Sequence, residues 1–135
     1  MTFDFSTVKP NDTHNMKKRV LVIEDEEDLR EVIKDLLEIL GVDIDLAVDG
    51  LEGIELQKAH SYDLVISDLK MPRCSGLEVL KWMRGQNIQT PVIFQTGHGS
   101  AKLMEDSSNT GILAVLEKPW DHEVLMDLTT KALGL

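Results

Sequence analysis

The sequence is poor in the residues on which several classes of protein depend. It has one cysteine among 135 residues, so it can form no internal disulfide bond and no cysteine-based zinc site. Its 14 basic residues are outnumbered by 24 acidic ones, and the net charge of −10 disfavours direct binding to nucleic acid or to an anionic membrane. No apolar run approaches the roughly 18 residues of a membrane span, and the N-terminal segment lacks the apolar stretch of a signal peptide. These features predict a soluble, cytoplasmic protein.

The chain nevertheless contains enough apolar residues for one core. Hydrophobic residues make up 42% of the sequence, and its length suits a single domain. Residues 1–16 show no hydrophobic period and include Pro10, Asn11 and Asp12. We therefore expect a mobile tail over residues 1–16, followed by one folded domain over residues 17–135.

Apolar strands and amphipathic helices alternate along this domain. Val20–Ile23 is a continuous apolar run, typical of a strand that is buried on both faces of a parallel sheet. The segment Leu29–Leu40 carries apolar residues at helical spacing, and Gly41 ends it. The same patterns predict further strands at Ile44–Val48, Leu64–Ile66, Pro91–Phe94 and Leu113–Leu116, and further helices at Leu51–His60, Leu77–Arg84, Ala101–Asn109 and Asp121–Leu133. In the helix Leu51–His60, we expect Leu51, Ile54 and Ala59 to face inward.

Five strands that alternate with five helices predict an α/β fold with a parallel sheet covered on both faces. Right-handed crossovers restrict the topology, and a doubly wound, flavodoxin-like (βα)5 arrangement with strand order 2-1-3-4-5 is the default for five such units. In this architecture a site forms where the carboxyl ends of the strands meet the loops that follow them.

The predicted strands bring a distinctive set of side chains to that edge. Glu24 and Asp25 follow the first strand, and Asp68 follows the third. Thr96 follows the fourth strand and Lys118 the fifth. Carboxylates held together repel one another unless a cation enters, and Mg²⁺ prefers such oxygen ligands. A carboxylate beside Mg²⁺ can act as a nucleophile on a phosphoryl group, while an ammonium and a hydroxyl group contact the phosphoryl oxygens.

Four short motifs, each at the end of a predicted strand, resemble those of the receiver domains of bacterial two-component response regulators, of the chemotaxis-response-regulator-like type. They are Leu21–Glu26, Asp68–Pro72 with Gly76-Leu77, Thr96-Gly97 and Lys118-Pro119. The resemblance extends from Lys18 to Leu133, nearly the whole chain outside the predicted tail.

The resemblance implies a phosphoacceptor and a metal site. Asp68 matches the aspartate that accepts a phosphoryl group from a histidine kinase or a phosphotransfer protein. Asp25 and Asp68 match ligands of Mg²⁺, and the backbone carbonyl of Lys70 matches a third. Glu24 matches an acidic position that holds the metal through water.

The resemblance also implies how the signal leaves the site. Thr96 matches the switch hydroxyl, and Lys118 matches the lysine that pairs with the phosphoryl group and precedes a cis bond to Pro119. Phosphorylation would change the surface from the fourth strand to the fifth helix, which would bind a downstream protein or form a homodimer through the fourth-helix to fifth-helix face. Because the chain ends with that helix, we expect a stand-alone receiver or phosphorelay member without an output domain. Its own chemistry would be limited to self-phosphorylation and slow self-dephosphorylation.

Two positions depart from the family pattern, and two other functions stay open. Val115 stands where the family often has an aromatic residue, and Ser75 replaces the usual Asp or Asn before Gly76. One alternative is a phosphorylation-independent binding module with an acidic pocket kept only for folding. The other is an aspartate-nucleophile phosphatase, but such enzymes have a second aspartate where this chain has Lys70, which argues against turnover of small phosphate esters.

Overall fold

The computed structural model describes residues 17–97 and 111–135. The strands are β1 (Arg19–Ile23), β2 (Asp43–Ala47), β3 (Leu64–Asp68), β4 (Val92–Thr96) and β5 (Ile112–Glu117). The helices are α1 (Glu27–Ile39), α2 (Gly50–Ala59), α3 (Gly76–Gly85) and α5 (His122–Leu133). The predicted tail over residues 1–16 and the predicted helix Ala101–Asn109 lie outside the described residues.

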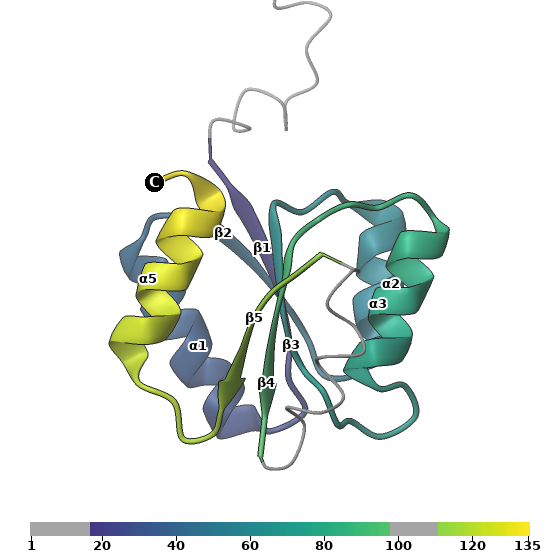
Figure 1. Ribbon diagram of the computed structural model, residues 1–135, viewed down its shortest axis with the longest axis horizontal. Coiled ribbons are helices and arrows are strands. Elements are labelled where there is room, and N and C mark those ends of the chain that lie inside the picture. The colour runs from purple at the N-terminus through teal and green to yellow at the C-terminus, as the bar shows by residue number, and fades with distance from the viewer. Residues whose placement is uncertain (1–16, 98–110) are drawn as a thin grey trace, which may run out of the picture.

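The five strands form one parallel sheet in the order β2-β1-β3-β4-β5, which confirms the predicted flavodoxin-like α/β fold. Helices α1 and α5 cover one face of the sheet, and α2 and α3 cover the other (Figure 1). Strands β3 and β4 extend beyond the predicted Ile66 and Phe94, to Asp68 and Thr96. The strands therefore carry the predicted site residues of β3 and β4 on regular backbone.

The central strands are buried on both faces because successive side chains point to opposite sides of a sheet. In β1, Val20 and Val22 belong to the core under α1 and α5, whereas Leu21 and Ile23 belong to the core under α2 and α3. All four side chains are fully buried. This two-sided burial is the physical reason for the continuous apolar run in the sequence.

Helix α2 packs through a different stripe from the predicted one. Leu51 is 48% exposed and Ala59 is also exposed, so the expectation that both face inward is wrong. The helix instead turns Gly53 toward the sheet, with Ile54 half-buried beside it. A Cβ atom at Gly53 would lie 2.4 Å from Cδ1 of Ile23, so the glycine allows the helix to lie directly on β1.

The N-terminus of α2 lies against the loop that follows β3. A Cβ atom at Gly50 would lie 2.4 Å from the backbone oxygen of Cys74, so no larger residue fits there without a shift. Asp49 caps the helix by accepting a hydrogen bond from the Glu52 N–H at 2.8 Å, and its other oxygen forms an ion pair with Arg73. Cys74 is buried in this contact, and burial raises the pKa of its thiol. These contacts fasten the loop to α2.

Helix α3 begins with a capping box. The Ser75 hydroxyl accepts a hydrogen bond from the Glu78 N–H at 3.2 Å, and the Glu78 carboxylate accepts one from the Ser75 N–H at 3.5 Å. Serine caps a helix about as well as Asp or Asn, which explains why Ser75 can occupy the position before Gly76.

None of the helices within residues 17–97 and 111–135 is long and apolar enough to cross a membrane.

A separate polar cluster joins the start of β1, the middle of β2 and the segment just before β3. Asp45 accepts hydrogen bonds from the Arg19 guanidinium at 3.0 Å and from the Tyr62 hydroxyl at 2.6 Å. The guanidinium also lies over the Tyr62 ring, 5.5 Å from its centre. The backbone N–H of Arg19 donates to Asp63 at 2.8 Å. We call Arg19, Asp45, Tyr62 and Asp63 the amino-end cluster.

Candidate functional site

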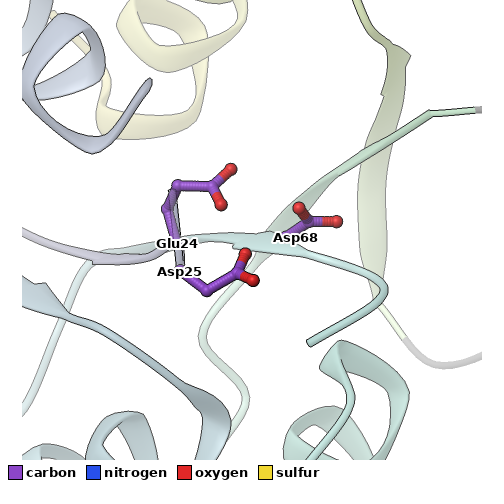
Figure 2. Close-up of side chains that lie close together, drawn as sticks. All are labelled: Glu24, Asp25 and Asp68. Atoms are coloured by element: carbon purple, nitrogen blue, oxygen red, sulfur yellow. The ribbon is translucent and has the colours of Figure 1, made fainter. Parts of the chain in front are cut away.

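Three carboxylates gather at the carboxyl ends of β1 and β3. Glu24 and Asp25 are the first residues beyond β1, and Asp68 is the last residue of β3. The two strands are parallel neighbours, so their ends lie side by side. One carboxylate oxygen from each residue lies within 4.8 Å of the other two. In Figure 2 the carboxyl groups of Glu24 and Asp25 point toward the side on which Asp68 lies.

Lys118 reaches the same group from the end of β5. Its Nζ lies 2.7 Å from Oδ2 of Asp68 and 3.2 Å from Oε1 of Glu24. We call Glu24, Asp25, Asp68 and Lys118 the carboxyl-end cluster. When all four groups are ionised, one positive charge faces three negative charges. The peptide bond between Lys118 and Pro119 is cis, as the resemblance predicts.

Glu24 is the most deeply buried member of the carboxyl-end cluster, with 0% of its surface exposed. Burial is the largest cause that raises the pKa of Glu24, to about 7. A hydrogen bond from the Glu26 N–H at 3.1 Å opposes this shift, as does the positive charge of Lys118. The neighbouring Asp25 and Asp68 reinforce it. At neutral pH this carboxyl group is therefore close to its midpoint between the protonated and the ionised form.

The pKa of Lys118 is governed by the same neighbours. Burial by itself lowers this pKa, but the hydrogen bond to Asp68 and the negative charges of Glu24 and Asp68 outweigh it. The net result is a pKa above the ordinary value for a lysine. The ammonium is thus firmly charged at neutral pH, as an electrostatic partner for anionic oxygens must be.

Asp68 occupies a recessed but reachable position and is 6% exposed. Its Oδ1 accepts a hydrogen bond from the backbone N–H of Lys70 at 3.2 Å, so the loop beyond β3 turns back over the carboxylate. A Cβ atom at Gly76 would lie 2.4 Å from the backbone oxygen of Asp68, which keeps the start of α3 close to the strand end. Asp25, in contrast, is exposed. The carboxyl-end cluster is therefore open to solvent on the Asp25 side.

Thr96 ends the strand next to β3. Gln95, the residue before it, is in register with Asp68, so Thr96 lies at the neighbouring strand end. Thr96 is 2% exposed, and its backbone carbonyl accepts a hydrogen bond from the Lys118 N–H at 2.7 Å. The structure thus places all the predicted site residues at one edge of the sheet, and it brings the three carboxylates and the Lys118 ammonium into direct proximity.

The donor set fits a hard divalent cation. Mg²⁺ binds oxygen ligands and commonly uses only one or two carboxylates together with water and phosphate oxygens. The clustered oxygens of Glu24, Asp25 and Asp68 meet this requirement, and the exposure of Asp25 leaves a path for the hydrated ion. A cation here would also relieve the repulsion between the carboxylates.

The sequence did not predict the hydrogen bonds of two residues beside the carboxyl-end cluster, of which one contacts the cluster and the other contacts the first. Gln95 donates a hydrogen bond from its side-chain amide to Glu24, and Trp120 donates one from its indole to Gln95. The sequence held one signal, because the amide of Gln95 follows the apolar run Val92–Phe94 in a strand predicted to be buried. Its partner could not be inferred, since Glu24 is 71 residues away along the chain.

Comparison with known proteins agrees with this geometry. The family model described as the response regulator receiver domain matches residues 20–130. The chain belongs to this family. Its fold resembles that of the receiver domain of a putative LuxO repressor protein from Vibrio parahaemolyticus, with a TM-score of 0.83 and 32% sequence identity over 87% of this chain and 91% of that one. It is a receiver domain of two-component signalling, a family whose members are phosphorylated on aspartate.

The relatives differ in how much chain surrounds the receiver domain. The transcriptional regulatory protein DltR of Streptococcus agalactiae is 37% identical over 108 residues, which are 80% of this chain but 48% of that protein. The sporulation initiation phosphotransferase F of Bacillus subtilis is 28% identical over 120 residues, which are 89% of this chain and 97% of that protein. The present chain therefore spans about half the length of the first relative and nearly all of the second.

Family membership also establishes the general properties of such a domain. Receiver domains bind Mg²⁺ at an acidic pocket and interact with histidine kinases or phosphotransfer proteins. They are in general signal transducers rather than enzymes.

Proposed function

We propose that this receiver domain accepts a phosphoryl group on the carboxylate of Asp68, from the phosphohistidine of a kinase or a phosphotransfer protein. The observation that carries the proposal is the arrangement around Asp68. Its carboxylate touches the Lys118 ammonium at 2.7 Å and shares a tight cluster with two further carboxylates. Such a group can neutralise the charge that moves onto an attacking carboxylate and a transferring phosphoryl group.

The transfer step is a substitution at phosphorus. A carboxylate oxygen of Asp68 forms the new P–O bond while the P–N bond of the phosphohistidine breaks, and the leaving imidazole nitrogen takes up a proton. Self-dephosphorylation follows when water attacks phosphorus, the bond to the Asp68 oxygen breaks and inorganic phosphate leaves. Lys118 would exchange its bond to Asp68 for one to a phosphoryl oxygen, and Thr96 would contact another.

Mg²⁺ would be held by Asp25, by Asp68 and by the backbone carbonyl of Lys70, with Glu24 contributing through water. When bound, the ion supplies positive charge at the phosphoryl oxygens. The hydrogen bond from the Lys70 N–H to Asp68 supports this assignment, because it keeps the Lys70 backbone beside that carboxylate.

The phosphoryl group would shift the protein between two conformations through the new contacts of Thr96 and Lys118, since a modification changes such an equilibrium only by interacting differently with the two states. The responding surface would run from β4 to α5, a region that includes residues outside the described ranges. It would bind a downstream protein or a second copy of the chain. We propose further that residues 17–135 act as the receiver, either alone or as a phosphorelay member, while its cytoplasmic location stays a prediction.

A phosphorylation assay tests the proposal. The wild type, Asp68→Asn and the control Asp63→Asn, which lies at the opposite end of the sheet, are incubated with Mg²⁺ and acetyl phosphate and then weighed as intact proteins. We expect one added phosphoryl group on the wild type and on Asp63→Asn, and none on Asp68→Asn. A wild type that gains no phosphoryl group would instead favour the phosphorylation-independent binding module, and rapid repeated hydrolysis of phosphate esters would favour the phosphatase.

A further inference from the structure

Strand β4 carries a buried amide among apolar side chains. Gln95 is 1% exposed and follows Val92, Ile93 and Phe94, all of which belong to the core. A buried side-chain amide loses free energy unless its donors and acceptor find partners. Gln95 finds both partners in side chains that are far from it in the sequence.

The side-chain amide of Gln95 accepts one hydrogen bond and donates another. The Trp120 indole N–H donates to Oε1 of Gln95 at 2.8 Å, and Nε2 of Gln95 donates to Oε1 of Glu24 at 2.9 Å. An indole N–H can only donate, so the Gln95 oxygen must face Trp120, which leaves the Gln95 amino group to face Glu24. The indole therefore fixes the orientation of the amide, because a flipped amide would lose the hydrogen bond from Trp120.

The chain of bonds ends on an atom of the carboxyl-end cluster. Oε1 of Glu24 accepts from Gln95 and is also 3.2 Å from Nζ of Lys118. Lys118 in turn contacts Asp68. At the other end, the Trp120 ring lines a surface hollow of about 480 Å³ between α1 and the turn before α5. A continuous chain of hydrogen bonds thus leads from this hollow to the carboxylate that we assign as the phosphoacceptor.

We propose that Gln95 is a positioning residue, which fixes the Glu24 carboxylate in the carboxyl-end cluster and links it to the Trp120 indole, so that cation binding at the cluster changes the surroundings of Trp120. The inference rests on the proposed function, because it requires that the cluster bind a divalent cation. A cation that draws Glu24 toward itself pulls on the Gln95 amide, and the only acceptor in that amide is already committed to Trp120. Glu24 would hold the ion through water, and Gln95 orients Glu24. The loss of a group that orients the residues around a metal commonly weakens metal affinity by about 10- to 100-fold.

The test uses full-length protein, Mg²⁺ and two readouts. Calorimetric titration gives the affinity for Mg²⁺, and nuclear magnetic resonance follows the indole N–H signals of Trp120 and Trp82, which are assigned from the variants Trp120→Phe and Trp82→Phe. Trp82 lies in α3 on the other face of the sheet and serves as the internal control. Gln95→Met keeps the length of the side chain and removes both hydrogen bonds.

For the wild type we expect Mg²⁺ to shift the Trp120 signal and to leave the Trp82 signal in place. For Gln95→Met we expect about tenfold weaker Mg²⁺ binding and a Trp120 signal that no longer responds. Trp120→Phe removes one bond of the chain and should weaken Mg²⁺ binding about two- to threefold, within the span of a single neutral hydrogen bond. Trp82→Phe should bind Mg²⁺ as the wild type does.

Each negative result in these experiments contradicts a different part of the proposal. If the wild type does not bind Mg²⁺, the metal site of the proposed function falls and this inference falls with it. If the wild type binds Mg²⁺ but its Trp120 signal stays in place, the proposed function stands and the link to Trp120 is overturned. Unchanged Mg²⁺ affinity in Gln95→Met overturns the positioning role. Should Gln95→Met fail to fold, the wild-type spectra and Trp120→Phe still decide the outcome.

Discussion

The two ends of the sheet carry ionic clusters of opposite character. In the amino-end cluster, the side chains of Arg19 and Asp45 are 29% and 34% exposed and form a single ion pair. The second carboxylate of the cluster, that of Asp63, accepts a hydrogen bond from a backbone N–H. At the carboxyl ends, Glu24 and Asp68 are 0% and 8% exposed at the side chain and share the Lys118 ammonium. In the Arg19–Asp45 pair each charge has its counter-charge. The carboxyl-end cluster instead concentrates negative charge where little solvent reaches it.

This difference separates a structural cluster from a functional one. An ion pair of one cation and one carboxylate that is partly solvated contributes little to stability. Buried carboxylates that outnumber their cation destabilise the fold until a further cation changes the balance. The carboxyl-end cluster therefore favours the binding of a cation. Variants of the carboxyl-end and amino-end clusters can measure how much each cluster contributes to stability.

The largest contrast should come from removing the cation of the carboxyl-end cluster. Lys118→Met leaves Glu24 and Asp68 without their ammonium, and we expect the metal-free protein to lose about 3–5 kcal/mol of unfolding free energy at neutral pH. Urea unfolding in the presence of a chelator measures the loss. A loss no larger than that of Arg19→Met, its counterpart at the amino-end cluster, would contradict the comparison.

The second contrast concerns pH. The pKa of Glu24 is raised from 4.5 to about 7 in the folded protein, so the folded state binds a proton more tightly than the unfolded state. Its contribution to stability is therefore fully present below pH 4.5 and is lost as the pH rises through about 7. A rise in pKa from 4.5 to about 7 corresponds to about 3–4 kcal/mol. Unfolding of the wild type and of Glu24→Gln, measured without metal across this range, should diverge; parallel profiles would refute the assignment.

A smaller effect is expected from the exposed member of the carboxyl-end cluster. Asp25→Asn should leave the metal-free protein as stable as the wild type, because this side chain is solvated. It should weaken Mg²⁺ binding about tenfold, which lowers the stabilisation by saturating Mg²⁺ by about 1.4 kcal/mol. Thermal unfolding with and without Mg²⁺ tests this, with Asp63→Asn as the matched control. Equal stabilisation of Asp25→Asn and wild type would exclude Asp25 as a ligand.

The smallest effect belongs to the amino-end cluster. Arg19→Met removes the ion pair with Asp45, and we expect a loss below about 1 kcal/mol because the pair is partly solvated and screened. Mg²⁺ should stabilise this variant as much as the wild type. A larger loss, measured by urea unfolding, would mean that the stacking of the guanidinium on Tyr62 contributes more than the ion pair does.

The parts of this structure that sequence predicts well are those set by local pattern. The alternation of apolar runs and amphipathic segments predicts a parallel sheet, whose observed order is the default for five such units. The apolar run Leu64–Ile66 places Asp68 close to a strand end, and β3 extends to that residue. The prediction of which residues of α2 face inward was wrong for Leu51 and Ala59. The close contact with β1 is made by Gly53, which has no side chain and so leaves no apolar signal in the sequence. The pairing of Gln95 with Glu24 was missed because no local pattern reports which buried donor meets which acceptor.

The close contact between Gly50 and Cys74 affects how fast the Cys74 thiol can react. Cys74 is the chain's single cysteine, and it is 5% exposed with a thiol pKa held above its ordinary value. A thiol reagent can modify it only during moments when α2 and the loop after β3 separate, because the reactive thiolate is both scarce and covered. The rate at which Cys74 is labelled thus reports how often this contact opens, and so how often the loop beside Asp68 moves away from α2.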